Sequence, residues 1–213
     1  MTGILSPPSK TPFMQNERNS SIWITWLNSI YEKLRGPLWE DNLTSLITSR
    51  PGSTAPTLRA FGPTGNIQQW DFGINDFVYT AGFHIGHDIK PGSKMYPHVH
   101  WSTNGVDTNI VKWELSYTFA KGHNQEAFPA EATLNLEEAG SGTAWQHMIT
   151  EATDAEAFTA PEVDSLILMK FRRVTNGGTN NGDQCFGIFV DLHYQKDRFG
   201  TPNKAPDFYK RGS

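Results

Sequence analysis

Residues 110–121 read IVKWELSYTFAK, and this stretch decides the fold class. Apolar side chains occupy every second position, and polar or charged side chains stand between them. Strict alternation over this length is typical of a strand in an antiparallel sheet with one face on a core and one on solvent. The alternation predicts a core-facing side made by Val111, Trp113, Leu115, Tyr117 and Phe119.

Two further stretches alternate in the same way. In residues 76–87 (DFVYTAGFHIGH), the predicted apolar side consists of Phe77, Tyr79, Ala81, Phe83 and Ile85. In residues 185–195 (CFGIFVDLHYQ), it consists of Phe186, Ile188, Val190, Leu192 and Tyr194. Residues 165–174 (SLILMKFRRV) differ, because Leu166–Met169 is apolar at every position, which predicts a central strand covered on both faces.

Loops rather than helices separate these strands. Shorter candidate strands lie at 95–102, 131–138 and 144–152. Turn-forming residues gather between the strands, at 90–93, 103–105, 140–142 and 176–182. Seven or eight strands without intervening helices favour an all-β fold, an antiparallel β-sandwich or jelly roll.

One helix is expected before the sheets. In residues 20–37 (SSIWITWLNSIYEKLRGP), apolar residues recur every three or four positions, a serine can cap the first turn, and Gly36-Pro37 ends the pattern. We expect this helix to anchor the chain in a partner, although packing on its own domain is the alternative. The anchoring side chains would be Ile22, Trp23, Trp26, Leu27 and Ile30.

The regions outside the helix and strands lack any apolar period and are rich in proline at the start. The sequence therefore divides into four predicted parts. They are an extended N-terminal arm (1–20), the anchoring helix (21–37), the β-sandwich domain (38–200) and an extended C-terminal arm (201–213).

Composition excludes several classes of protein. With 18 basic against 22 acidic residues, the net charge of −4 argues against a nucleic-acid partner. No run approaches the ~20 apolar residues of a membrane helix, and the first residues lack the apolar core of a signal peptide. The single cysteine, Cys185, excludes an internal disulfide and is expected to be an inert core thiol. A soluble intracellular protein is expected.

The sharpest local motif is a pair of histidines. His98 and His100 stand two residues apart on a predicted strand, so both imidazoles point to one side. With Gly92 they match the opening of the cupin metal motif, a glycine, five residues and His-x-His. The glutamate of that motif would fall at Asn104 or Gly105, and neither supplies a carboxylate. We therefore expect no metal and no cofactor, the weak candidate ligands being His98, His100 and, from another strand, His193.

No signature of a nucleophile elbow, a phosphate loop or a zinc protease occurs in the sequence. We therefore predict no catalytic residue and no enzyme. An alternative is a sugar-binding platform formed by Trp70, Trp101, Trp113 and Trp145. Aromatic residues on alternating strands, however, are more often part of the core. Such a site would use aromatics among the loops Thr103–Asp107, Lys121–Phe128 and Thr175–Asp183.

Five stretches in order resemble a poorly characterised family of tailed-bacteriophage virion proteins. They are LWED (38–41), FHIGHDIKPGSKMYPHVHWS (83–102), VKWELSYTFA (111–120), SLILMKFRRV (165–174) and FGIFVDLHYQKDRFGT (186–201). The Pro-His-Val-His-Trp strand at Pro97–Trp101 is the most specific of them. The chain departs from the family pattern at Tyr96, where a histidine is expected, and at Val174, where an acidic residue is expected.

The resemblance implies a non-enzymatic β-sandwich component of the virion, made in the host bacterial cytoplasm. It would be attached to the capsid or tail, as a decoration, cement, tail-fibre or adaptor protein, and would form a homotrimer. Its partners would be other virion proteins and, as an addition, a host glycan, but neither nucleic acid nor a membrane. The alternatives are a glycan-binding receptor module of a phage tail and, with less support, a cupin-like metal-binding enzyme.

Overall fold

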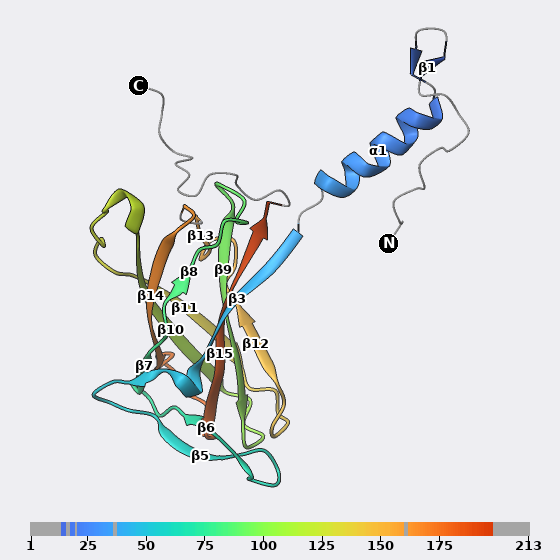
Figure 1. Ribbon diagram of the computed structural model, residues 1–213. Helices are drawn as coiled ribbons and strands as arrows, with labels where there is room; N and C mark the ends of the chain where they lie inside the picture. Colours follow the sequence, from blue (N-terminus) through green and yellow to red (C-terminus); the bar gives the residue numbers. More distant parts are fainter. Residues whose placement is uncertain (1–13, 16–17, 20, 36–37, 160–161, 198–213) are drawn as a thin grey trace. The chain divides into compact units, whose positions relative to one another are not determined.

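The computed structural model of the chain, drawn in Figure 1, describes residues 14–15, 18–19, 21–35, 38–159 and 162–197. The chain separates into two compact units, Met1–Leu38 and Trp39–Ser213. Some predicted segments lie outside the described residues, namely most of the arm 1–20, the helix end 36–37, the sandwich end 198–200 and the arm 201–213.

The first unit contains the predicted helix. Helix α1 spans Ser21–Arg35, and within it the rings of Trp23 and Trp26 meet edge to face with centroids 5.4 Å apart. Before the helix, β1 (Met14–Gln15) and β2 (Arg18–Asn19) pair antiparallel, inside the segment predicted as an extended arm. No helix among the described residues is long and apolar enough to cross a lipid bilayer.

The second unit is an antiparallel β-sandwich, which confirms the predicted fold class (Figure 1). The first sheet has the order β11-β10-β14-β7-β4 with β8 on β14; its strands are β4 (Arg50–Pro51), β7 (Phe77–Tyr79), β8 (Phe83–His84), β10 (Ile110–Lys121), β11 (Ala132–Ala139) and β14 (Ser165–Val174). The second sheet has the order β12-β9-β15-β6-β5 with β13 on β9 and β3 on β15; its strands are β3 (Leu38–Ser45), β5 (Thr57–Phe61), β6 (Ile67–Asp71), β9 (Lys94–Thr103), β12 (Met148–Glu151), β13 (Phe158–Thr159) and β15 (Cys185–Lys196). Two short 3-10 turns are η1 (Leu46–Thr48) and η2 (Gly122–Asn124).

The core lies between the two sheets and is rich in aromatic rings. Trp113 of β10 stacks on Phe171 of β14 with centroids 4.8 Å apart and meets Trp101 of β9 at 6.2 Å. Both tryptophans are fully buried, and truncating such a side chain typically costs about 3–5 kcal/mol. The alternation of residues 110–121 is confirmed, because Val111, Trp113 and Leu115 are buried in this core.

The prediction of one continuous strand at 76–87 is wrong. Two short strands form instead, and both pair with β14: β7 lies opposite Lys170–Arg172 and β8 opposite Leu166–Ile167. Val78 is fully buried whereas Tyr79 is 41% exposed, so the side expected to be apolar in β7 is the outer one. The irregular segment between β7 and β8 changes the phase of the alternation, because Phe83 of β8 is buried again.

The prediction that β14 is covered on both faces is also wrong. β14 is central in its sheet, and Ile167, Met169 and Phe171 are buried as expected. The alternate residues Leu166 and Leu168 are 37% and 42% exposed. A two-layer sandwich covers only one face of each sheet, so apolar residues at every position do not require a second covering layer.

Candidate functional site

Three strands of the second sheet bring polar side chains to its outer face. His98 of β9 lies opposite Asp191 of β15, and Tyr96 lies opposite His193. On the other edge of β9, Glu151 of β12 lies opposite His98. Residues opposed in an antiparallel pair project from the same side of the sheet. This shared side is the outer one, because the alternating neighbours are fully buried in the core: Val99, Val190 and Leu192.

A β-bulge in β15 sets which residues reach this face. Gly187 lies opposite Trp101, but Phe189 lies opposite His100, the next residue back along β9. Ile188 is therefore an extra residue on β15. Because side chains alternate with a period of two, one inserted residue reverses the faces of all that follow.

The bulge overturns the prediction that Phe186, Val190 and Leu192 share one side. Before the bulge, Phe186 lies opposite Ser102 and faces outward. Beyond it, Val190 and Leu192 face the core and Asp191 faces outward. Over its second half, β15 therefore directs apolar side chains into the core and polar side chains onto the outer face.

At the centre of the outer face, the carboxylate of Asp191 meets two imidazoles. Its Oδ2 lies 3.3 Å from Nε2 of His98 and 3.1 Å from Nε2 of His100, and the two Nε2 atoms are 3.1 Å apart. The side chains of His98 and Asp191 are only 2% and 8% exposed. Among the described residues, neither His98 Nδ1 nor Asp191 Oδ1 has a hydrogen-bond partner. Buried polar atoms normally have one, so the hydrogen-bonding capacity of this group is not used up by the described residues.

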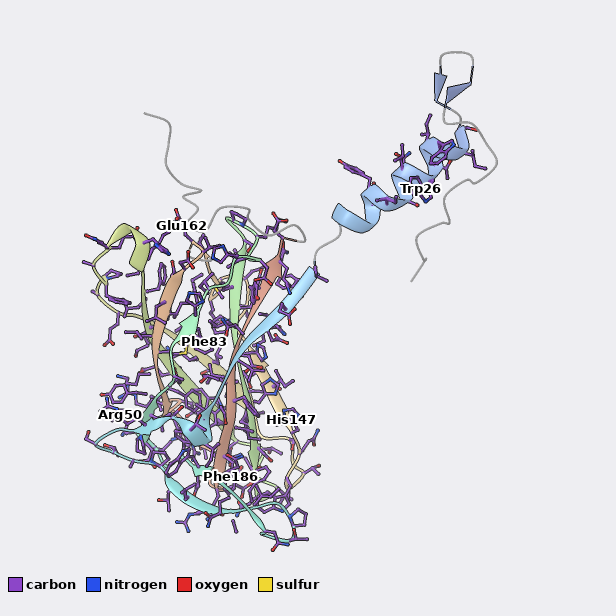
Figure 2. All side chains as sticks on the ribbon, viewed as in Figure 1. Trp26, Arg50, Phe83, His147, Glu162 and Phe186 are labelled. Atoms are coloured by element: carbon purple, nitrogen blue, oxygen red, sulfur yellow. The ribbon has the colours of Figure 1, made fainter. Side chains whose placement is uncertain are left out.

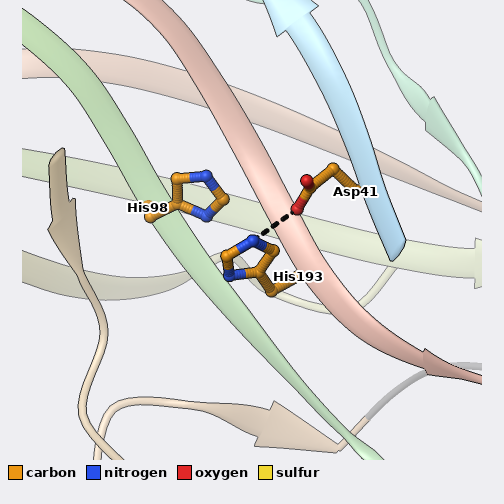
Figure 3. A group of neighbouring side chains, drawn as sticks. All are labelled: Asp41, His98 and His193. Atoms are coloured by element: carbon orange, nitrogen blue, oxygen red, sulfur yellow. Dashed lines mark ion pairs between the residues drawn. The ribbon is translucent and has the colours of Figure 1, made fainter. Parts of the chain in front are cut away.

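His193 lies beside this centre and is held by two carboxylates. Its Nε2 is 2.6 Å from Oδ1 of Asp41, which comes from β3 (Figure 3). Its Nδ1 is 2.5 Å from Oε1 of Glu151, and its ring lies against His98 with centroids 4.1 Å apart. We call the whole group the Asp191 cluster, with the members Asp41, His98, His100, His147, Glu151, Asp191 and His193.

The surroundings shift the pKa values of the two central histidines in opposite directions. Burial by itself lowers the pKa of His98, but the hydrogen bond and charge of Asp191, together with Asp41 and Glu151, outweigh it and raise the pKa above its usual value. Burial lowers the pKa of His100, and the neighbouring imidazoles lower it further against the attraction of Asp191. His98 therefore loses its proton less readily than a free imidazole, and His100 loses it more readily.

A pocket of about 520 Å³ opens beside the cluster. This volume lies within the roughly 300–1,000 Å³ of small-molecule sites. Its lining combines apolar side chains with a few polar ones: Leu43, Phe61, His100, Ser102, Trp145, His147, Ile188, Phe189 and Asp191. His147 precedes β12 in the chain (Figure 2), and its Nε2 lies 2.7 Å from Nδ1 of His100.

Trp145 is the large aromatic side chain of the pocket. It is half-buried, and its ring meets Phe61 edge to face at 5.4 Å and Phe186 at 5.6 Å. Its backbone is left-handed, with φ of 65°, and its N–H donates to the carbonyl of Thr103 at 2.7 Å. A bulky residue in this conformation is strained, so the surrounding contacts must hold the indole in place.

A second hollow of about 310 Å³ borders the cluster; it is lined by Trp39, Tyr96, Glu151 and His193. The rings of Trp39 and Tyr96 meet edge to face at 5.7 Å, and Trp39 is 47% exposed. Each of the two hollows thus shares residues with the Asp191 cluster and carries a tryptophan.

A different group of histidines surrounds Asp164. The Nε2 atoms of His84, His87 and His123 lie 3.7, 3.3 and 3.4 Å from its carboxylate oxygens. These three side chains are 64%, 41% and 49% exposed. We call this group the Asp164 cluster.

The structure brings together the three histidines that the sequence offered as weak metal ligands, His98, His100 and His193. It adds Asp191, which sequence analysis missed. The signal that was available is its position two residues before His193 on the same strand, which places both on one face. Asp41, His147 and Glu151 come from segments whose register the sequence does not reveal.

The other predicted residues are placed as follows. In α1, Ile22 and Leu27 are exposed, and the remaining anchoring candidates, Trp23, Trp26 and Ile30, are half-buried. Their role in anchoring stays a prediction. Cys185 is fully buried, and burial raises the pKa of its thiol to about 12, as expected of an inert core thiol.

The predicted sugar platform is only partly realised. Trp101 and Trp113 are core residues, and Trp70 packs partly buried against the core. Trp145 lines the larger pocket. No residue of that lining belongs to the three loops proposed from the sequence, and Trp39 of the second hollow was not considered.

No family model and no curated protein matches the sequence. Among solved structures, the chain is similar to the CBM36-1 domain of a multidomain xylanase from the hindgut metagenome of Trinervitermes trinervoides, at 10% identity over 72% of this chain and 96% of that chain, with a TM-score of 0.42. It is also similar to CBM35 of Abf62 from Cellvibrio japonicus, at 6% identity over 72% and 92%, with a TM-score of 0.40. Because identity and TM-score are low, we interpret the site from its own residues.

Proposed function

We propose that the chain is a carbohydrate-binding β-sandwich module whose site is the outer face of the second sheet. The observation that carries this proposal is the pocket beside the Asp191 cluster, where a half-buried tryptophan stands next to hydrogen-bonding side chains. This function is the alternative that the sequence left open beside a purely structural role.

The chemistry of the pocket suits a sugar ring. One face of a pyranose presents C–H groups, which pack on an aromatic ring, and its edge presents hydroxyl groups, which need donors and acceptors. Trp145 and Phe61 supply aromatic surface, while His100, His147 and Asp191 supply hydrogen-bonding groups at the same pocket. A small set of polar groups in an apolar pocket is typical of a ligand site.

The second hollow extends this surface past the cluster. Trp39 and Tyr96 supply aromatic rings there, and Glu151 and His193 supply polar groups. Glu151 and His193 also belong to the Asp191 cluster, whereas His100 and Asp191 of that cluster line the larger pocket. Two hollows that carry aromatic rings and both border the Asp191 cluster favour an oligosaccharide over a single sugar.

A glycan array probed with the full chain tests the proposal, followed by calorimetric titration of the glycans that bind. We expect Trp145→Ala to weaken binding by at least about tenfold, since the aromatic surface is lost. Trp145→Asn serves as a second variant, because asparagine tolerates the left-handed backbone. Phe128→Ala, which removes an exposed aromatic side chain outside both hollows, is the matched control. An array without signal, or unchanged binding in both Trp145 variants, would overturn the proposal.

Attachment to a phage particle is a second candidate function, and α1 favours it. Four large side chains of this helix are 41–52% exposed: Ile22, Ile24, Leu27 and Tyr31. Fully burying an exposed large apolar side chain yields roughly 1.5–3 kcal/mol, so burying the exposed part of each of these yields about half as much. We expect the double variant Trp23→Ala/Trp26→Ala to keep a folded sandwich but to be lost from purified particles; recovery at the wild-type level would contradict the anchoring role.

A further inference from the structure

We propose that His98 Nε2, His100 Nε2 and Asp191 Oδ2 bind one divalent transition-metal ion of the zinc type. Sequence analysis predicted no metal, because the glutamate of the cupin motif is missing. Asp191, supplied by the neighbouring strand β15, takes the place of that carboxylate. The inference does not depend on carbohydrate binding, and either proposal can fail alone.

The distances among the three atoms are those of ligands on a common ion. The separations are 3.1, 3.1 and 3.3 Å. Ligand atoms about 2.1 Å from one ion, at angles between octahedral and tetrahedral, are roughly 3.0–3.4 Å apart. The two histidines and the carboxylate therefore converge without any rearrangement of the strands.

Protons alone do not satisfy this arrangement. If both Nε2 atoms donate to Asp191, two N–H donors lie 3.1 Å from each other. An ion would take the three lone pairs and move the imidazole protons to the Nδ1 atoms, of which that of His98 has no acceptor among the described residues. Nδ1 of His100 is already 2.7 Å from Nε2 of His147. Ligating histidines usually donate their second N–H in this way, so His147 would be the outer partner of the site.

A second grouping, Asp41 with His98 and His193, is less suited to an ion. The 2.6 Å between His193 and Asp41 is a hydrogen-bond distance rather than a ligand separation. The other nitrogen of His193 is engaged by Glu151 at 2.5 Å. His193 therefore borders the site as a neighbour of His98 rather than as a ligand.

The ligand types determine the class of metal. Imidazole nitrogens suit zinc, nickel, copper and iron, whereas calcium and magnesium require oxygen ligands. Three protein ligands leave at least one coordination position for water or another molecule. Because His100 and Asp191 also line the larger pocket, that position would face the pocket.

The test is a calorimetric titration of zinc chloride into the full chain without a polyhistidine tag, after treatment with a chelator and in buffer free of carbohydrate. We expect about one zinc ion per chain by titration and by elemental analysis, with calcium giving no signal. Zinc should also raise the midpoint of thermal unfolding, since a ligand of the folded state stabilises it. Uptake far below one ion per chain would overturn the proposal.

Two variants locate the ion. We expect Asp191→Asn and His100→Asn to weaken zinc binding by more than the roughly 10–100-fold typical of outer-partner changes. Asp164→Asn is the matched control, because it alters the other histidine cluster, and should leave the affinity unchanged. Circular dichroism verifies the fold, and the half-buried His100 gives a second variant should Asp191→Asn not fold. Zinc binding that survives in a folded variant, or that disappears in Asp164→Asn, would place the ion elsewhere and overturn the assignment.

Discussion

The Asp191 cluster and the Asp164 cluster contain all seven histidines of the chain, yet they differ in how closely their polar atoms approach one another and in the burial of their central histidines. In the first, two imidazole nitrogens and a carboxylate oxygen lie within 3.3 Å of one another. In the second, three exposed imidazoles lie 3.3–3.7 Å from two different oxygens of one aspartate.

The difference arises from the elements that carry the histidines. His98 and His100 sit on β9, where the ladder to β15 and the alternation of side chains fix both position and direction. In the Asp164 cluster, His84 ends the two-residue strand β8, whereas His87 lies in a turn, His123 in η2 and Asp164 in the turn before β14. Composition alone therefore does not distinguish a convergent site from a surface cluster of the same residue types.

The largest difference between the clusters is expected in stability. In metal-free protein, Asp191→Asn should lower the free energy of unfolding by about 2 kcal/mol, because it removes a charge-assisted hydrogen bond from buried His98. Asp164→Asn should lower it by less than about 0.5 kcal/mol, since its partners are exposed and asparagine tolerates the φ of 63° at this position. Urea unfolding of the two variants measures both values. An equal loss of unfolding free energy in the two variants would contradict the greater contribution to stability that burial gives the Asp191 cluster.

A smaller difference is expected in chemical reactivity. Diethyl pyrocarbonate acylates accessible imidazole nitrogens, so the exposed His84, His87 and His123 should react first. His98, with a side chain 2% exposed, should react at least about tenfold more slowly, since it needs local opening of the sheet. Peptide mass spectrometry at several reaction times gives the rate at each site. Rapid modification of His98 in the native protein would contradict the burial on which the comparison rests.

Much of the fold is predictable from local sequence. Alternation identified β10, the spacing of apolar residues identified α1, and the long β14 and β15 lie where the apolar stretches indicated. These features depend on neighbours along the chain. The exposure of Leu166 and Leu168 and the break between β7 and β8 depend on how many layers the fold has and on how two short strands share β14.

The candidate site was predictable only in part for the same reason. The pair His98 and His100 is visible because the two residues share one strand. The carboxylate that completes it comes from Asp191, and its place opposite His98 depends on the register of two strands separated by more than eighty residues. The bulge at Ile188 sets that register, and its one local signal is Gly187, an isolated glycine within a strand pattern.

The bulge allows β15 to lose one residue at this point without changing which side chains its second half directs outward. Ile188 is half-buried, and another side chain there would change one position. Deleting it would leave Phe189 opposite His100 and Asp191 opposite His98 in a regular ladder, so Asp191 and His193 would still face outward. Pairing Ile188 within the ladder, without a bulge, would instead turn Asp191 and His193 toward the core, so the site depends on where β15 departs from regular pairing rather than on which residue does so.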